Sequence, residues 1–279
     1  MRNSPKIAPP APRCPQKQAS VCRLALRLLW PPPSNRERAL PLFKRSDDER
    51  YARRMARIAR WDRPIEPGWD RFSAWMNMVF VDHGIFRLVY LNRHKVTERF
   101  WRAAQPTPGQ IAQAAKDGIK TIVNLRGGRE YGSWPLEREA CEANGLILAE
   151  FVLRSREAPD REAILSLADF FATLTYPVLV HCKSGADRAG FMSALYLLIA
   201  ENRSADEALA QLSPWYGHFR FAKTGILDAF VEMYRDEGEK NGKNFLDWVR
   251  DDYDPERLKQ SFKTGMVSEL VVDRILHRE

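Results

Sequence analysis

From about residue 97 onward, short runs of β-branched and apolar residues alternate with longer stretches in which apolar positions recur at helical spacing. The pattern predicts strands within 100–106, 120–126, 146–153 and 176–181, and helices at 108–117, 135–144, 160–175, 188–201, 205–213, 222–236 and 255–277. Strands that alternate with helices along a chain are typical of a parallel sheet. We therefore expect an α/β fold with a central, mainly parallel sheet of about four to five strands, flanked by helices on both faces.

The residues before this body have a different pattern. The first 45 are rich in Pro and Arg and show no periodicity, which predicts a disordered basic arm. A helical extension is expected next, with Ser46 as its N-cap and Glu49 completing a capping box. Apolar and aromatic positions within 69–83 recur at helical spacing, and this stripe is expected to pack on a core. The predicted arm, helical extension, α/β body and C-terminal helical tail span 1–45, 46–96, 97–240 and 241–279.

Positive charge is concentrated at the N-terminus. Residues 1–63 hold 16 Lys and Arg against 5 Asp and Glu, a net charge of +11, whereas residues 64–279 hold 28 against 31, a net charge of −3. The arm could contact an anionic membrane weakly, or it could simply be solvated. No nucleic acid partner is expected. The sequence contains no apolar run of about 18 residues, the length that a spanning helix needs.

The four cysteines are Cys14, Cys22, Cys141 and Cys182. They form no CxxC pair, and no group of cysteines and histidines has the spacing of zinc ligands. A disulfide framework is therefore not expected, and a reducing, cytoplasmic setting is predicted. We further expect the chain to be a monomer.

The chemistry is concentrated in the segment from His181 to Arg188, HCKSGADR. An apolar strand ends at His181, an apolar helix begins at Arg188, and Gly185 permits the sharp turn between them. The backbone N–H groups of such a loop and the helix N-terminus bind an anion and stabilise a thiolate at Cys182. That thiolate could attack phosphorus in line, while the planar fork of Arg188 binds two phosphate oxygens.

The other positions of this segment are expected to shape the loop or bind phosphate. His181 could hydrogen-bond the backbone and fix the shape of the loop. The predicted phosphate-binding positions are His181, Lys183, Ser184, Gly185 and Ala186. The alternative is that Cys182 is a buried structural cysteine, because cysteine is often buried. The polar residues that follow Cys182 are not typical of a buried core segment, and Cys141 is the better candidate for a buried structural cysteine.

The segment 178–190, VLVHCKSGADRAG, resembles the active-site loop of the protein tyrosine and dual-specificity phosphatases. Upstream, 101–106 and 119–126 are similar to the opening strands of the compact, dual-specificity-like branch of bacteria and fungi, so the resemblance covers about 97–235. It implies a phosphatase domain over 97–240, a phosphocysteine intermediate, and neither metal nor cofactor. The expected substrate is a phosphorylated protein carrying phosphotyrosine, with dual specificity as an extension. The alternatives are a phosphoinositide, inositol phosphate or sugar phosphate phosphatase, and a phosphate-binding pseudophosphatase.

The general acid does not follow the family's usual pattern. Family members take it from an Asp on a loop well before the cysteine, and here the nearest, Asp160, lies only 22 residues before Cys182 and is placed to cap a helix. Certain bacterial tyrosine phosphatases and myotubularin-type lipid phosphatases carry an Asp-Arg pair in the loop, which makes Asp187 the first candidate. The like charge of bound phosphate favours a protonated carboxyl there. Alternatively, Asp187 points away and pairs with an arginine outside the loop or with the backbone, and Glu157 and Asp160 are then the reserve candidates for the acid.

Two further features bear on turnover and substrate. After the arginine, most family members carry Ser or Thr, whose hydroxyl helps the thiolate leave the phosphoenzyme, whereas this chain has Ala189. Four arginines on loops after strands could bind a second phosphate or an acidic substrate, or could be solvated: Arg126, Arg129, Arg154 and Arg156. An aromatic turn over 213–218 could wall the pocket, although packing is the more common role of such a turn.

Overall fold

The computed structural model describes residues 47–264, and every structural statement below concerns this part of the chain. Four helical segments precede the sheet: α2 (Asp47–Trp61), α3 (Trp69–Met76), the π-helix η1 (Asn77–Val81) and α4 (Ile85–Val89). The strands are β1 (His94–Lys95), β2 (Phe100–Ala104), β3 (Thr121–Asn124), β4 (Ile147–Glu150) and β5 (Val178–Cys182). The helices between the strands are α5 (Pro108–Lys116), α6 (Ser133–Ala143), α7 (Arg161–Leu165) and α8 (Leu167–Thr173).

After the last strand the described chain is helical to its end. The α-helices are α9 (Asp187–Ile199), α10 (Ala205–Leu209), α11 (Ile226–Glu237) and α12 (Phe245–Asp251). Short 3-10 helices join them: η2 (Pro214–Tyr216), η3 (Lys223–Gly225) and η4 (Glu239–Asn241). A further helix covers 255–264, and the rest of the predicted tail lies outside the described residues.

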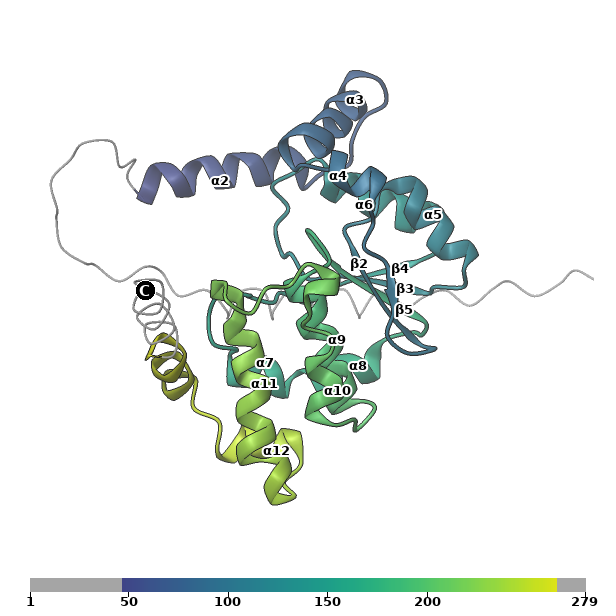
Figure 1. Ribbon diagram of the computed structural model, residues 1–279. Helices are drawn as coiled ribbons and strands as arrows, with labels where there is room; N and C mark the ends of the chain where they lie inside the picture. The colour runs from purple at the N-terminus through teal and green to yellow at the C-terminus, as the bar shows by residue number, and fades with distance from the viewer. Residues whose placement is uncertain (1–46, 265–279) are drawn as a thin grey trace, which may run out of the picture. The chain divides into compact units, whose positions relative to one another are not determined.

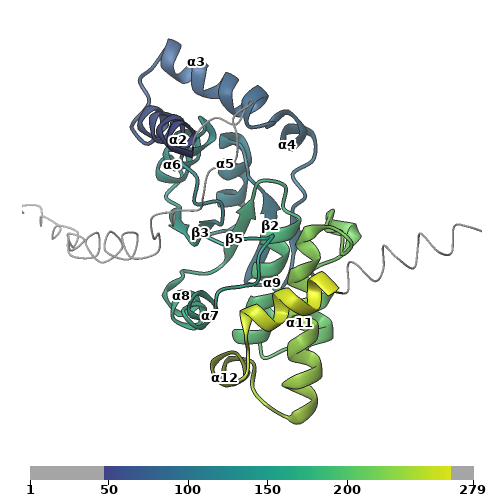
Figure 2. The ribbon, with the colours of Figure 1, turned by 90° about the vertical axis from the view of Figure 1, so that its left-hand side faces the viewer.

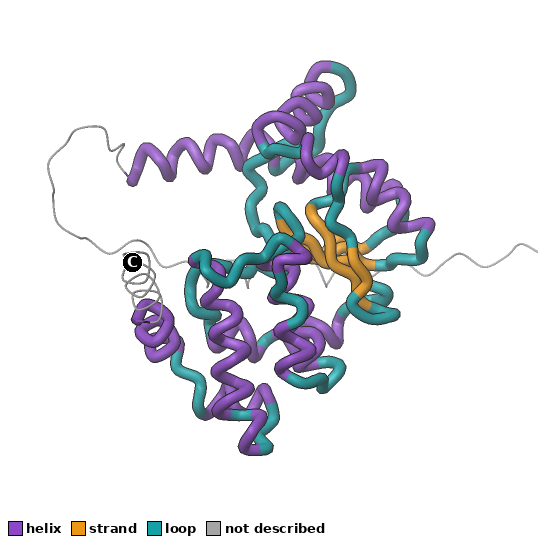
Figure 3. The backbone as a smooth tube through the Cα atoms, in the orientation of Figure 1, coloured by secondary structure: helices purple, strands orange, loops and turns teal. Residues whose placement is uncertain are grey.

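The five strands form one sheet in the order β1-β2-β5-β3-β4. The strands of this sheet are drawn in orange in Figure 3. β2, β3, β4 and β5 are parallel to their neighbours, and only the short β1 runs antiparallel to β2. Helices lie on both faces: α5 and α6 on one side, and α7 to α12 on the other (Figures 1 and 2). The predicted fold class is therefore confirmed.

Successive side chains of β5 pack in the two cores on opposite faces of the sheet. Val178 and Val180 face the larger core, which α9 and α11 help to build, whereas Leu179 faces the smaller core under α5 and α6. Because successive side chains of a strand point to opposite faces, Cys182 continues the first set and His181 the second. The two neighbouring residues of the motif are thereby directed to opposite sides of the sheet.

Several element boundaries differ from those predicted by the sequence. The strand expected over 146–153 is only the four residues of β4, and the helix expected over 160–175 is divided at Ser166 into α7 and α8. The pattern missed α4 and α12. Thr107 does cap α5 with Gln110 in a capping box. The predicted cap at Ser46 lies outside the described residues.

The N-terminal helices form a small core of their own. Trp61 at the end of α2 packs with Ala74 and Met78 of the α3–η1 segment and with Leu136 of α6. The prediction that the stripe over 69–83 packs on a core is only half right, because Ala74 and Met78 are buried whereas several of its largest side chains are exposed.

Candidate active site

Cys182 is the last residue of β5 and lies where three parallel strands end together. It pairs in register with Ala104 of β2, and the preceding His181 pairs with Asn124 of β3. Four loop residues, 183–186, then lead into α9, whose first turn contains Arg188. This is the carboxyl edge of the sheet, where open α/β folds place their ligand sites.

Cys182 and Arg188 are thus brought to one end of the sheet, as the motif predicts. The thiol is 2% exposed, and the guanidinium of Arg188 is partly buried and donates to the carbonyl oxygen of Leu125 at 3.4 Å. Leu125 directly follows β3, so Arg188 reaches across the strand ends. Cys141, the expected structural cysteine, is buried in α6, and burial raises its pKa far above the ordinary value.

Gly185 is required by the geometry of the loop. Its φ is +78°, a conformation that side chains with a Cβ rarely adopt. A Cβ at this position would also lie 2.6 Å from the backbone nitrogen of Ala104 and 3.0 Å from the Asn92 side-chain nitrogen. The loop therefore packs directly on the end of β2, which only glycine permits.

Two side chains that the sequence reasoning missed hold this loop from outside. Arg102 of β2 is fully buried and donates to the carbonyl oxygens of Gly185 at 2.8 Å and Ala186 at 2.9 Å. Its guanidinium lies 4.0 Å from the centre of the Tyr216 ring, and burial lowers its pKa to about 10. Asn92 donates to the carbonyl oxygen of Ser184 at 3.1 Å. A charged residue inside an otherwise apolar strand was the available signal for Arg102.

His181 lies behind the loop rather than in it. Its side chain is fully buried, its Nε2 lies 2.5 Å from Glu137 of α6, and its Nδ1 lies 3.4 Å from the carbonyl oxygen of Cys182. Glu137 also accepts from Gln105 at 2.5 Å and from Asn124 at 3.3 Å. This buried network suits the predicted role of His181 in fixing the loop's shape better than direct contact with substrate.

Asp82, between η1 and α4, is a buried carboxylate that several cationic side chains near the loop contact. It is fully buried, pairs with Arg126 through both oxygens at 2.6 and 2.7 Å, and accepts from Arg87 at 2.9 Å. Burial pushes the pKa of Asp82 upward, but the hydrogen bonds and charge of Arg126, with the charge of Arg87, outweigh it and lower the pKa to about 2. Lys183 of the loop lies 3.5 Å from the same carboxylate.

The loop arginines considered for substrate binding are mostly engaged within the protein. Arg126 binds Asp82, as above, and Arg129 pairs with Asp62 at 3.0 Å and with Glu150 at 2.5 Å. These contacts leave Lys183 and Arg188 as the cations best placed beside Cys182.

Asp187 pairs with a side chain outside the loop, and the partner is a histidine rather than the arginine or backbone group considered from the sequence. His218, from the aromatic turn, lies with Nδ1 2.7 Å from Asp187 and Nε2 2.6 Å from Asp228 of α11. Burial alone would lower the pKa of His218, but hydrogen bonds and charges of the two carboxylates raise it to about 9. The imidazole is fully buried, and because the two carboxylates raise its pKa above 7 it is a cation at neutral pH that donates to both of them. The sequence offered only the position of the turn, with no signal for this pairing.

The reserve acids have local roles. Asp160 caps α7 by accepting from the backbone N–H of Ala163 at 2.9 Å. Glu157 is exposed and pairs with Arg154 at 2.6 Å. The position after the arginine is occupied by Ala189, which has no hydroxyl and is fully buried.

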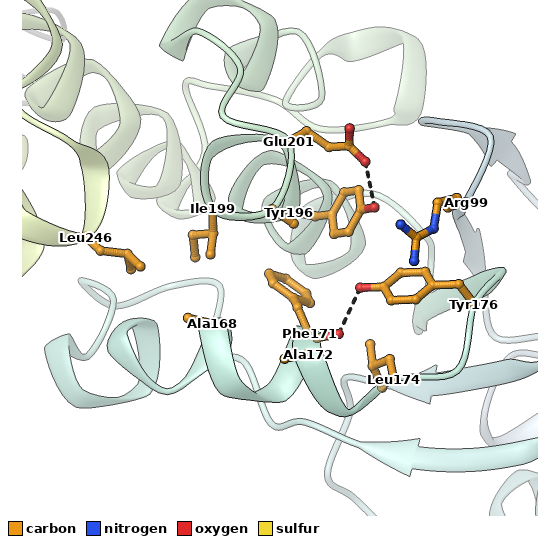
Figure 4. Close-up of a pocket in the computed structure, with 11 residues that line it drawn as sticks. Arg99, Ala168, Phe171, Ala172, Leu174, Tyr176, Tyr196, Ile199, Glu201 and Leu246 are labelled. Carbon is orange, nitrogen blue, oxygen red and sulfur yellow. Dashed lines mark hydrogen bonds between the residues drawn. The ribbon is translucent and has the colours of Figure 1, made fainter.

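A cleft of about 490 Å³ lies elsewhere in the molecule (Figure 4). It is lined by aromatic side chains, with the Tyr196 hydroxyl donating to Glu201 at 2.7 Å and Arg99 stacked over Tyr176. Arg99 and Tyr176 precede β2 and β5, so the cleft is at the opposite end of these strands from Cys182. It contains none of the candidate catalytic residues.

Among residues 47–264 there is neither a metal-binding cluster nor a membrane-spanning helix. No group of three or more His, Cys, Asp and Glu side chains could hold a metal ion. None of the described helices is both long and apolar enough to cross a membrane.

Comparisons with known proteins agree on one class. A family model described as a DSP-PTPase phosphatase fused to NAD+ kinase matches residues 86–223. The inositol diphosphatase DSP4 of Arabidopsis thaliana is 28% identical over 177 residues, which cover 60% of this chain and 76% of that protein. The protein tyrosine phosphatase domain-containing protein 1 of Mus musculus is 32% identical over 111 residues, 36% of this chain and only 15% of that protein.

Two solved structures illustrate the structural matches. P. aeruginosa TpbA covers 62% of this chain and 91% of its own, with 16% identity and a TM-score of 0.43. The core catalytic domain of the PP-IP phosphatase SIW14 of S. cerevisiae covers 55% of this chain and 90% of its own, with 17% identity and a TM-score of 0.42.

The family model and the curated relatives fall on the region that carries the sheet and the loop. Over this region the chain is similar to phosphatases of the dual-specificity-like branch of the protein tyrosine phosphatase superfamily. The matched region begins at residue 86, inside the predicted helical extension.

Proposed function

We propose that the chain hydrolyses phosphomonoesters through a phosphocysteine on Cys182. The Cys182 thiolate attacks phosphorus, an S–P bond forms, and the ester P–O bond breaks as the leaving oxygen takes up a proton. Water then attacks the phosphocysteine, the S–P bond breaks, and phosphate leaves with the thiolate restored. The observation that carries this proposal is the placement of Cys182 and Arg188 at one strand end, joined by the loop that Arg102 and Gly185 hold.

For the proton, we favour Asp187 acting together with His218. Asp187 opens α9 beside Arg188, and the buried His218 cation donates to its carboxylate at 2.7 Å. When phosphate dianion enters the loop, its charge draws the proton along this hydrogen bond toward Asp187, which passes it to the leaving oxygen. In the second half-reaction Asp187 accepts the proton of the attacking water. His218 is a positioning residue in this scheme, and Asp228 holds its other nitrogen.

Phosphotyrosine in proteins, with dual specificity as an extension, is the first substrate class we propose. The second is an inositol phosphate or phosphoinositide. Two observations favour this second class: Lys183 is a partly exposed cation inside the loop, and the Arabidopsis relative is named an inositol diphosphatase. A substrate with several phosphates would engage both Lys183 and Arg188.

Phosphate release from a chromogenic aryl phosphate tests the mechanism. Cys182→Ser is expected to abolish release, whereas Cys141→Ser, the matched control in a buried structural cysteine, is expected to leave it unchanged. A panel of phosphopeptides, phosphoinositides and inositol phosphates then ranks the substrates by kcat/KM. If wild-type protein binds phosphotyrosine tightly but releases no phosphate from any member, the chain is a phosphate-binding pseudophosphatase and the proposal is wrong.

A further inference from the structure

The helices before the sheet present a large exposed apolar surface. We define the outer face by six side chains: Trp69, Phe72, Met76, Phe80, Phe86 and Val89. Each is at least 40% exposed, and Trp69, Phe86 and Val89 reach 79%, 73% and 89%. None of these six side chains is buried by another described residue. Exposed apolar patches mark interaction sites, and within this set the rings of Trp69 and Phe72 lie 5.3 Å apart.

The helical spacing explains why this surface is separate from the local core. In α3 and η1, Ala74 and Met78 face α2 and α6 and are buried. Trp69, Met76 and Phe80 lie on the opposite side of the same helical segment, because positions about seven and four residues apart share a face. The segment is therefore apolar on two sides, and only one of them has a partner within the described chain.

α4 reverses the usual pattern of a surface helix. Its buried residue is charged, because Arg87 turns inward to Asp82 at 2.9 Å and to Gln105 at 2.9 Å. Its apolar residues, among them Phe86 and Val89, are the exposed ones. Arg87 thus anchors α4 to the body in the orientation that displays its apolar side chains.

The acidic residues of this segment are withdrawn from the outer face. Residues 69–90 contain two, Asp70 and Asp82. Asp82 is fully buried, and Asp70 pairs with Arg63 at 2.8 Å and accepts from the backbone N–H of Glu66 at 3.1 Å. An anionic surface would therefore meet no exposed carboxylate of this segment that lacks a cationic partner.

We propose that the outer face docks on an anionic membrane surface. The residues that precede it in the sequence, 1–63, carry a net charge of +11, and α2 within them contributes five arginines against three acidic residues. An apolar face with Trp and Phe that follows a strongly basic segment in the sequence is the combination that binds the interface of anionic bilayers.

The segment that carries the outer face is also linked to the catalytic loop. η1 ends at Val81, and the next residue, Asp82, joins the helical segment to the loop through Lys183 and to β3 through Arg126. Both views of the ribbon place α3 and α4 on the same side of the molecule (Figures 1 and 2). Asp82 therefore connects the segment that carries the outer face with the catalytic loop.

Vesicle sedimentation of the full chain tests the proposal without reference to catalysis. The wild-type chain is expected to sediment with phosphatidylcholine vesicles that contain phosphatidylglycerol, and to bind pure phosphatidylcholine vesicles and vesicles in high salt much less. The variant Trp69→Ser/Phe72→Ser/Phe80→Ser is expected to bind at least about tenfold more weakly, because each aromatic side chain contributes apolar burial. Phe221→Ser, which removes a 76% exposed aromatic far along the chain, is the matched control and should bind like wild type.

The outcomes distinguish binding by the outer face from binding by the basic arm. Equal binding by the triple variant and wild type would show that the basic arm acts alone and would overturn the proposal, as would an absence of wild-type binding. A wild-type dimer in solution that the triple variant converts to a monomer would identify the outer face as a self-interface instead, and would also overturn it. Circular dichroism checks that the triple variant is folded, which its exposed positions lead us to expect.

Discussion

Removing the buried cation at position 218 should change how stability depends on pH. His218 lies between Asp187 and Asp228, and its folded-state pKa is raised from 6.5 to about 9. A raised pKa stabilises the folded state fully below the unfolded value of 6.5, and this contribution is lost as the pH rises through about 9. At 1.36 kcal/mol for each pH unit between the two values, the contribution is about 3 kcal/mol.

The variant His218→Asn should be less stable than wild type by about this amount at pH 6, and the difference should disappear above pH 9. Urea unfolding at pH 6, 7.5 and 9.5, followed by circular dichroism, measures the free energy of unfolding of each protein. His83→Asn is the matched control: His83 is exposed, and its φ of +56° is one that Asn accepts. That variant should follow wild type at every pH.

The same pH dependence in wild type and His218→Asn would refute this account of the buried cation. So would a variant that is less stable by a constant amount at all three pH values, because a constant loss indicates packing rather than charge. The result bears on function as well, since the proposed proton path needs His218 to be protonated at neutral pH.

Three further substitutions test the site. Asp187→Asn should slow hydrolysis of phenyl phosphate at least about a hundredfold and that of p-nitrophenyl phosphate far less, because only the poor leaving group needs the proton; equal losses in kcat would exclude Asp187 as the acid. Gly185→Ala should lower the free energy of unfolding by at least about 2 kcal/mol in urea, more than Gly145→Ala, whose φ is also positive but whose Cβ would meet nothing within 4 Å. Ala189→Ser should raise kcat in steady-state assays by restoring a hydroxyl beside the thiolate, and an unchanged or lower kcat would show that dephosphorylation does not limit turnover.

The sequence predicted the parts of the site that depend on neighbouring residues. The apolar strand before Cys182, the glycine within the loop and the apolar helix after it are local features, and the structure places all three as expected. Pairings between distant segments were not accessible in the same way. His218 and Asp187 are 31 residues apart, and nothing in a single sequence shows that their side chains meet.

The outer face illustrates a different limit. Periodicity identified the helix over 69–83 and its apolar side chains, but it does not say what covers an apolar side. In this chain one side meets α6 and the other is exposed, so the expectation of core packing held for Met78 and failed for Phe80. The sequence also could not predict that Arg87 is buried, because the turn before α4 is what brings its partner Asp82 into the interior.

The most direct test of the central claim is to trap the intermediate. The full chain is mixed with an aryl phosphate, quenched in acid within the first turnover, and digested for mass spectrometry of the peptide that contains residues 178–190. We predict phosphate on Cys182 in wild type and none in Cys182→Ser, which should also release no phosphate. Phosphate on another residue, or continued turnover by Cys182→Ser, would contradict the account.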